Sequence, residues 1–448
     1  MKHKKKFYFI LLLVAFIVAH GVASWWVGEQ AQQISTQQVS YLNKQLERLS
    51  TEQGVEQSVQ LELDTVKRGV WSSERYLTVT WFDGKRQQRY VLEDNLQHGP
   101  WPWALIKKGQ WKPVIAFSQM HLLEQGAGKN LYDWALGKTP LLINTEINWG
   151  GQFNSHWEWV ALVNEKSKEP FTLGAGSLEI HSIGQSRYQL QAQAPAFSLS
   201  YQGEELRFIE PEIKWLSTNP NSLYDGQVNF KALSFEWRTE TLLQAEHLDI
   251  EVVQHSQDGY FDLTTQADLR HVVIDRGILL GNFALRMQLE RFAQSVAAQT
   301  LSSNKPKTKD EKDALWLQKL AEYPKYTVES FIWENDGGKA TLSGFVTLAP
   351  RLGDELDKAA LEVNLPSGVL KNVIGQEKGV KAAMLSLLLE GLIKEGEQLG
   401  FLLYDQDAIH VSMQYDQTAD NYVLNGKSHK KGDMQAILFK WLYWLVNQ

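Results

Sequence analysis

Residues 283–290 read Phe-Ala-Leu-Arg-Met-Gln-Leu-Glu, so every second side chain in this stretch is large and apolar. Successive side chains of a β-strand point to opposite faces, and this alternation therefore predicts a strand with one apolar and one polar face. The same pattern recurs at 188–192, 233–237 and 248–252. Strands of this kind are typical of an antiparallel sheet with one side facing solvent.

Turn-forming residues divide the region from 171 to 289 into consecutive strands. The breaks fall at Gly184, Gly203, Asn219-Pro220-Asn221, Asp225-Gly226, Asp258-Gly259 and Gly281. Further along, Asn335-Asp336-Gly337-Gly338 is typical of a tight hairpin between strands at 326–333 and 339–348. The sequence therefore predicts a long antiparallel meander without a repeat of fixed length.

The predicted fold class is α+β and mostly β, with helices near the middle and the C-terminus of the meander. A single helix is expected over about Val369–Leu399. The predicted regions are 1–27, a cytoplasmic lysine cluster and membrane anchor; 28–54, a helical stalk; 55–290, an antiparallel β domain; 291–325, a helical and charged-loop insertion; and 326–448, an α+β region ending in an apolar helix.

The N-terminal segment has the features of a signal anchor. Lysines precede the apolar segment Phe7–Val27, whose 21 residues would form a helix of about 31 Å, close to a hydrocarbon core of about 30 Å. The lysines before it and Trp25-Trp26 at its end predict a single pass through the inner membrane, with a cytoplasmic N-terminus and the bulk of the chain in the periplasm. The alternative is a signal peptide cleaved near Ala19–Ala23, which would leave a periplasmic protein.

Two helical surfaces are candidates for contacts. Val39, Leu42, Leu46 and Leu49 form an apolar seam that packs on its own domain or, alternatively, pairs with a second copy as a homo-oligomer. The last helix, Met434–Leu445, is apolar nearly all round, and we expect it to dock on the sheet. Membrane insertion and a subunit contact are the alternatives for that helix.

Composition excludes several classes of function. The 448 residues carry a net charge of −7 and no basic face, which argues against a nucleic-acid partner. The absence of cysteine excludes disulfides, zinc–thiolate sites and thiol catalysis. The 17 tryptophans are scattered, and we expect them to contribute to half-buried sheet packing.

A search for chemistry yields no catalytic, cofactor-binding or metal-binding residues. The phosphate loop and the Gly-x-Ser-x-Gly elbow are absent, and Gly174-Ala175-Gly176 lacks the third glycine of a dinucleotide site. No histidine pair has zinc-ligand spacing. His98 stands in a rigid turn, where we expect it to bond a backbone carbonyl rather than to catalyse. The basic pairs Lys67-Arg68 and Lys107-Lys108 are expected to be solvated.

Several segments resemble a known family. They are 68–73 (Arg-Gly-Val-Trp-Ser-Ser), 98–102 (His-Gly-Pro-Trp-Pro), 137–140 (Gly-Lys-Thr-Pro), 411–415 (Val-Ser-Met-Gln-Tyr) and 424–427 (Leu-Asn-Gly-Lys). Together they resemble the YdgA-like family of Gram-negative inner-membrane or periplasmic proteins, which carry a domain of unknown function. The resemblance implies a location in the cell envelope and supplies no catalytic residue.

Three functions are compatible with these observations. The first is an uncharacterised, non-enzymatic, membrane-anchored periplasmic protein that binds a lipid or another hydrophobic ligand on its sheet. The second is an envelope scaffold that self-associates or binds protein partners. The third is an envelope hydrolase that uses scattered Asp, Glu or His side chains.

Overall fold

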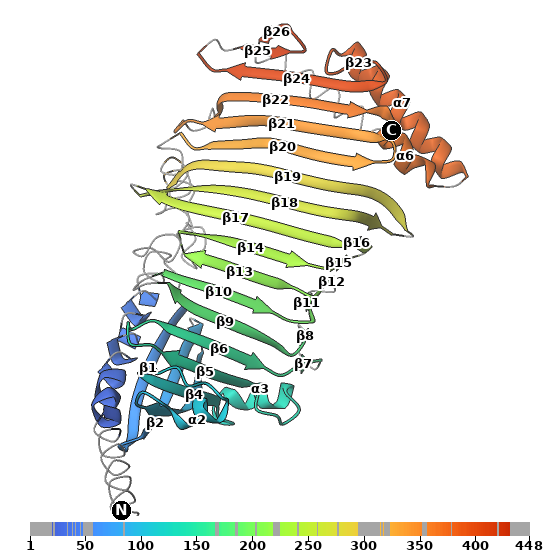
Figure 1. The fold of residues 1–448 in the computed structure, drawn as a ribbon. Helices are drawn as coiled ribbons and strands as arrows, with labels where there is room; N and C mark the ends of the chain where they lie inside the picture. Colours follow the sequence, from blue (N-terminus) through green and yellow to red (C-terminus); the bar gives the residue numbers. More distant parts are fainter. Residues whose placement is uncertain are drawn as a thin grey trace, which may run out of the picture. The chain divides into compact units, whose positions relative to one another are not determined.

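The computed structural model confirms a mostly β protein with antiparallel pairing and few helices (Figure 1). It describes residues 20, 23–33, 35–37, 39–40, 42–44, 46–47, 57–83, 86–165, 170–183, 187–201, 204–217, 225–239, 242–257, 259–275, 277–293, 314, 317, 323–351, 356–377, 379–418 and 421–430. The lysine cluster, most of the predicted anchor, most of the 291–325 insertion and the last helix lie outside these residues. Within them, no helix has the length and apolarity needed to cross a membrane.

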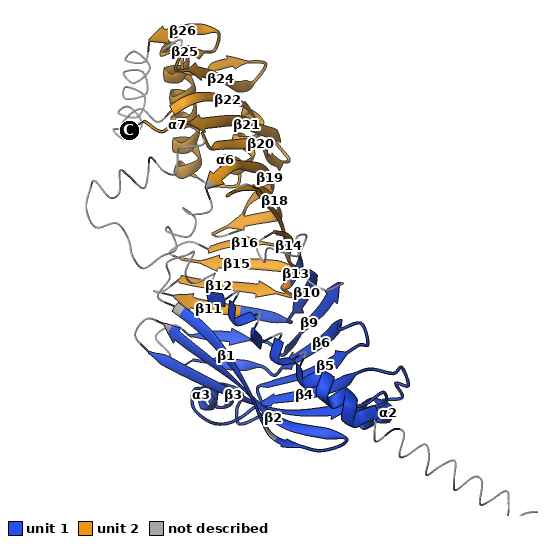
Figure 2. Cartoon of the chain, turned by 90° about the vertical axis from the view of Figure 1, so that its left-hand side faces the viewer, with its two compact units in different colours: residues 1–197, 213–223, 298–304 blue, residues 198–212, 224–297, 305–448 orange. Residues whose placement is uncertain are grey.

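The chain divides into two compact units (Figure 2). Unit 1 comprises 1–197, 213–223 and 298–304, and unit 2 comprises 198–212, 224–297 and 305–448. The division falls inside the predicted 55–290 domain. Strands β11 (Ala196–Tyr201) and β13 (Glu212–Ser217) contain two of the points at which the chain passes from one unit to the other.

Unit 1 is built on one antiparallel ladder. Its strands pair in the order β1 (Gln57–Arg68), β2 (Ser72–Asp83), β3 (Gln87–His98), β4 (Ala116–Leu122), β5 (Leu141–Ile147), β6 (Phe153–Trp159), β9 (Gly176–Ile183) and β10 (Arg187–Gln193). A short hairpin, β7 (Leu162–Asn164) with β8 (Phe171–Leu173), stands beside them. Helices α2 (Trp103–Lys107) and α3 (Gly128–Trp134) lie in the loops after β3 and β4.

Unit 2 continues the pattern of consecutive hairpins. Its main ladder runs β14 (Gly226–Ala232), β17 (His247–Gln257), β18 (Tyr260–Ile274), β19 (Ile278–Ala293), β20 (Lys325–Asn335), β21 (Gly338–Leu348), β22 (Leu356–Pro366), β24 (Ala408–Asp416), β25 (Asn421–Leu424) and β26 (Lys427–Lys430). A second ladder joins β12 (Glu204–Ile209), β15 (Ser234–Arg238) and β16 (Leu242–Ala245) to the end of β18, and β23 (Leu403–Asp405) pairs with β24. The predicted hairpin is confirmed, because Asn335 pairs directly with Gly338.

The helix predicted over 369–399 is two helices, α6 (Ser367–Gly375) and α7 (Val380–Gln398). They are separated at Gly379, whose φ of +72° lies outside the helical region. Glycine adopts this conformation without the Cβ clash of other residues. Residues 375–379, Gly-Gln-Glu-Lys-Gly, contain no apolar side chain, so the prediction of one helix is wrong at a point where the apolar pattern stops.

The described residues between 23 and 47 are helical, and this N-terminal helix packs on unit 1 (Figure 2). Val27, 1% exposed, and Ala31, fully buried, share a core cluster with Leu96, Ile115, Ala116 and Ile147. The Asn43 side chain bonds both backbone groups of Leu61 on β1 at 2.8 Å. Val27, expected to end the membrane span, is therefore part of the core of unit 1. Leu42 of the predicted seam is 41% exposed.

Candidate functional site

The first two segments that resemble the family meet at one end of β2 and β3. The Nε2 atom of His98 lies 2.9 Å from the Ser73 hydroxyl, and the His98 backbone N–H donates to the Trp71 carbonyl at 2.8 Å. Antiparallel pairing causes this meeting, since β2 begins where β3 ends. Segment 137–140 precedes β5, whereas 411–415 and 424–427 belong to β24 and the β25–β26 turn.

His98 is buried under the N-terminal helix. Its side chain is 2% exposed, and an added Cβ on Gly28 of the helix would lie 2.4 Å from its Nδ1 atom. Burial lowers the pKa of His98 to about 4, while a backbone contact from Val70 opposes that shift. Nδ1 itself has no hydrogen-bond partner of normal geometry among the described residues. His98 is therefore a buried, neutral packing residue. We expected a turn histidine bonded to a backbone carbonyl; its ring contacts the Ser73 hydroxyl, with a further backbone contact from Val70.

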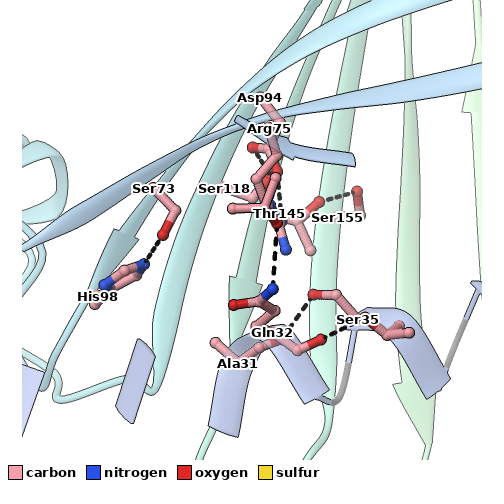
Figure 3. Close-up of polar contacts among 12 residues, drawn as sticks. Ala31, Gln32, Ser35, Ser73, Arg75, Asp94, His98, Ser118, Thr145 and Ser155 are labelled. Atoms are coloured by element: carbon pink, nitrogen blue, oxygen red, sulfur yellow. Dashed lines mark hydrogen bonds and ion pairs between the residues drawn. The ribbon is translucent and has the colours of Figure 1, made fainter. Parts of the chain in front are cut away.

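A buried ion pair lies beside it (Figure 3). Arg75 and Asp94, 2% and 0% exposed, face each other across β2 and β3, and the Arg75 Nε donates to an Asp94 oxygen at 2.9 Å. Ser118 of β4 donates to the other Asp94 oxygen at 2.7 Å. The Arg75 Nη1 has no partner within the described part of the chain. A buried charge pair needs additional hydrogen bonds, such as the one from Ser118, because moving both charges out of water is costly.

These groups belong to a polar belt, which we define as Ser73, Arg75, Asp94, Ser118, Thr145 and Ser155. The belt continues on β5 and β6, where the Thr145 and Ser155 hydroxyls lie 2.7 Å apart. Beside the belt, the Gln32 amide of the N-terminal helix donates to the Thr65 hydroxyl of β1 at 3.3 Å.

Hydrolases use a serine next to a histidine, and the Ser73–His98 pair has the same two side chains. Such a pair needs an accessible serine and a group that orients the other histidine nitrogen. Ser73 and His98 are 5% and 2% exposed, and the described residues supply no orienting group to Nδ1. The Ser73–His98 hydrogen bond joins β2 to β3 beneath the N-terminal helix. The described ranges also contain no cluster of acidic or histidine side chains that could hold a metal ion.

A second candidate site is the apolar face of unit 2. Two rows of side chains cross the strands at its centre, from β14 to β24. The first row is Phe230, Ile250, Ala267, Leu285, Phe331, Leu342, Val363 and Val411. The second row is Val228, Val252, Thr265, Met287, Val328, Gly344, Leu361 and Met413. The opposite face is polar and carries cross-strand pairs such as Lys231–Asp249 at 2.8 Å and Lys325–Glu290 at 3.2 Å. The alternation at 283–290 therefore predicted the two faces correctly.

No described layer covers the centre of this face. Every residue in the two rows is partly exposed, whereas Leu96 under the helix of unit 1 is fully buried. Helix α6 is fixed at the strand ends, where Gln376 bonds both backbone groups of Leu279 at 2.7 Å (Figure 1). The face remains an extended apolar surface among the described residues.

The comparisons with known proteins agree with the resemblance. Residues 3–430 match the family described as "Bacterial protein of unknown function (DUF945)". The chain belongs to this family. Protein YdgA of Escherichia coli (strain K12) is 24% identical, over 90% of this chain and 92% of the relative. No solved structure matches. Family membership therefore identifies the relatives of this chain but assigns no activity to it.

Sequence reasoning singled out His98 but missed its bonding partner Ser73 and the neighbouring ion pair. Ser73, Arg75 and Asp94 lie 25, 23 and 4 residues away along the sequence. A usable signal was present for Asp94, which occupies an inward position between Leu92 and Leu96 on β3. A carboxylate at such a position predicts a buried cationic partner on a neighbouring strand.

Proposed function

We propose that this protein is a non-enzymatic envelope protein, anchored in the inner membrane, whose unit 2 binds the acyl chain of a lipid on its apolar face. The observation that carries the proposal is the pair of apolar rows whose side chains remain partly exposed. Leaving such a surface in water is unfavourable, by about 25 cal/mol for each Å² that could be buried. An extended apolar surface of this kind marks a binding site for an apolar partner.

The dimensions of the face suit acyl chains. Neighbouring strands lie about 4.8 Å apart, so a row that crosses from β14 to β24 is roughly 34 Å long. One leaflet of a bilayer core is about 15 Å thick, half of the whole core. A row is therefore long enough for an acyl chain laid across the strands. Because the rows contain no charged side chain, the chain would meet no buried charge along them.

The predicted location supplies the ligand. A signal anchor would hold the domain at the outer surface of the inner membrane, next to a large store of lipid. Anchorage is supported by the lysines and the apolar run of the N-terminal sequence. The proposed anchor and the proposed binding face therefore both contact membrane lipid.

Neighbouring residues of β20 allow a matched crosslinking test. Phe331 lies in an apolar row, paired with Leu285 and Leu342, while Ile332 points to the opposite face. A photo-reactive phenylalanine derivative is placed at either position in the full-length chain, and membranes are irradiated. We expect lipid adducts, detected by mass spectrometry, at position 331 and not at position 332.

The outcome that contradicts the proposal is equally specific. Equal lipid labelling at 331 and 332 would mean contact with bulk membrane rather than a site on one face. Exclusive protein adducts at 331 would replace the lipid with a protein partner. Both positions are on the same strand, so a difference in folding does not account for a difference in labelling.

One observation favours a second function, docking of a protein partner. Val380, Met384 and Leu387 of α7 are 84%, 57% and 68% exposed, and their spacing of four and three places them on one side of the helix. An amphipathic helix with an unpaired apolar side is a common partner surface. Substituting Met384 and Leu387 with serine should abolish a docked complex seen by crosslinking in membranes, if this helix is the interface.

A further inference from the structure

Unit 1 exposes tryptophans at one end of its strands. The loops at 69–71, 99–115 and 148–152 all leave the sheet from this end, because β2, β4 and β6 begin where β1, β3 and β5 finish. They carry Trp71, Trp103, Trp111 and Trp149, which are 46%, 65%, 68% and 51% exposed. We call these loops, together with Trp25 and Trp26 of the helix, the tryptophan end.

Contacts bring the helix and two of the loops together. The His20 ring stacks with Trp71 and with Trp101, at centroid distances of 5.0 Å and 6.1 Å. The guanidinium of Arg68 lies 5.6 Å from the ring of Trp25 and donates to the Trp25 carbonyl at 3.3 Å. Trp25, 52% exposed, is therefore held at the end of β1, next to the loop that carries Trp71.

The third loop is tied to the second through the backbone. The Ile115 N–H donates to the Ile147 carbonyl at 2.7 Å, just before the β5–β6 turn that carries Trp149. The Trp101 indole N–H donates to the Trp111 carbonyl at 3.1 Å, which anchors the middle loop. These bonds hold the loops and their exposed indoles at the end of the sheet.

The charge of this end is opposite to that of the whole chain. The three loops contain Lys107, Lys108 and Lys112 and no Asp or Glu, although the net charge of the chain is −7. All three lysines are exposed. Indole rings combined with lysines are the side chains that sit at the headgroup level of a bilayer, where the rings meet both apolar and polar groups.

The N-terminal apolar run leads directly into this end. The apolar residues Phe7–Ala19 immediately precede His20, whose ring stacks on Trp71 and Trp101. Val27, seven residues further on, is part of the core of unit 1. If the run lies in the bilayer, as the proposed anchorage requires, no spacer separates it from the tryptophan end.

We propose that the tryptophan end is a membrane-interface surface, which seats unit 1 directly on a bilayer containing anionic phospholipid. The rings of Trp103 and Trp111 enter the headgroup region, and Lys107 and Lys112 lie at the level of the phosphates. This inference rests on the membrane anchorage of the proposed function and not on its lipid-binding face. Extraction of the full-length chain with alkaline carbonate tests the anchorage separately.

The lack of cysteine gives a direct test, because one introduced cysteine can be labelled uniquely. Trp103→Cys, Trp111→Cys and the control Leu136→Cys are each made in the full-length chain, which is spin-labelled and reconstituted into vesicles of phosphatidylcholine with phosphatidylglycerol. Leu136 is 84% exposed and precedes β5, at the strand end opposite to Trp149. All three positions are exposed, so these variants leave the core of unit 1 intact.

Collision with oxygen and with a water-soluble nickel complex then reports the depth of each label. We expect severalfold lower nickel accessibility and higher oxygen accessibility at 103 and 111 than at 136. Equal nickel accessibility at all three positions overturns the proposal, even if the chain resists carbonate extraction. Labels at 103 and 111 that are shielded from both reagents also overturn it, because they indicate a protein partner.

The lysines give a second measurement. Lys107→Glu combined with Lys112→Glu should raise nickel accessibility at position 111 in vesicles with phosphatidylglycerol, and have little effect in phosphatidylcholine alone. High salt should reduce the difference, because the attraction is screened. Lys129→Glu, an exposed position in α3, is the matched control. No lipid dependence of the double variant would contradict the assigned role of these charges.

Discussion

Strands with one apolar and one polar face have different surroundings in the two units. In unit 1 the N-terminal helix covers the sheet, Leu96 is fully buried, and an ion pair lies in the interior. In unit 2 the apolar rows remain partly exposed among the described residues, and the cross-strand ion pairs lie on the opposite, solvated face. A covered face specifies a rigid structure, whereas an open one is available for binding. Substitutions in matched positions can separate these two roles.

The largest expected effect concerns the buried ion pair. Asp94→Ala leaves the Arg75 charge buried without its partner and should lower the free energy of unfolding by about 3–5 kcal/mol. Urea unfolding followed by tryptophan fluorescence measures the loss. The matched control is Asp249→Ala in unit 2, which removes a partly exposed partner of Lys231 and should cost less than about 1 kcal/mol. Equal losses would mean that the environments of the two pairs do not differ.

The next effect is a dependence on pH. Because the pKa of His98 is about 4 in the folded chain and about 6.5 when unfolded, the unfolded state binds the proton first as the pH falls. Neutral His98 contributes about 3 kcal/mol to the free energy of unfolding. This contribution is fully present above pH 6.5 and is lost as the pH falls from about 6.5 to 4. A His98→Gln variant should lack this part of the slope in unfolding experiments. His121→Gln, at an exposed histidine on β4, should retain it.

A smaller effect is expected from the close approach of the helix to His98. Gly28→Ala places a Cβ 2.4 Å from the His98 Nδ1 atom. The overlap should cost about 1–3 kcal/mol, which exceeds the gain of up to about 1 kcal/mol from alanine in a helix. Thermal unfolding compares it with Gly150→Ala, where no atom lies within 4 Å of the new Cβ. A stabilised Gly28→Ala variant would show that the helix is not tightly docked.

The smallest effect on stability is expected on the apolar face. Leu285→Ser changes a side chain already in contact with solvent, so the free energy of unfolding should change by about 1 kcal/mol or less. Lipid crosslinking from position 331 should nevertheless fall, because Leu285 lies directly opposite in the row. Ala284→Ser, on the other face, should leave crosslinking unchanged. A loss of several kcal/mol at Leu285 would indicate a covered core instead.

Local sequence patterns predicted the strands, but contacts between distant segments could not be predicted from the sequence. Alternation at 283–290 and the turn at 335–338 predicted β19, β20 and β21, because strand faces and tight turns depend on neighbouring residues. The partnership of Arg75 with Asp94 depends on the register of two strands. The break before α7 had a local signal, because residues 375–379, Gly-Gln-Glu-Lys-Gly, contain two glycines and no apolar side chain.

The tryptophans show a different limit. We expected sheet packing for all of them, and the expectation fails for those of the tryptophan end, where Trp111 is 68% exposed. Trp103 and Trp111 lie between the end of β3 and the start of β4, outside any strand. Their position outside any alternating stretch was the available signal. Lys107 and Lys108, expected to be merely solvated, belong to the same loop.

The hairpin connectivity of unit 2 has a consequence for the order of folding. From β17 to β21 each strand pairs with the one that follows it, through short turns at 258–259, 275–277 and 336–337 and one long connection at 294–324. Contacts between sequence neighbours close with little loss of chain entropy, so such a sheet can grow by adding one strand at a time. During synthesis the N-terminal segments emerge first. Each new strand then finds a partner edge already formed by its predecessor.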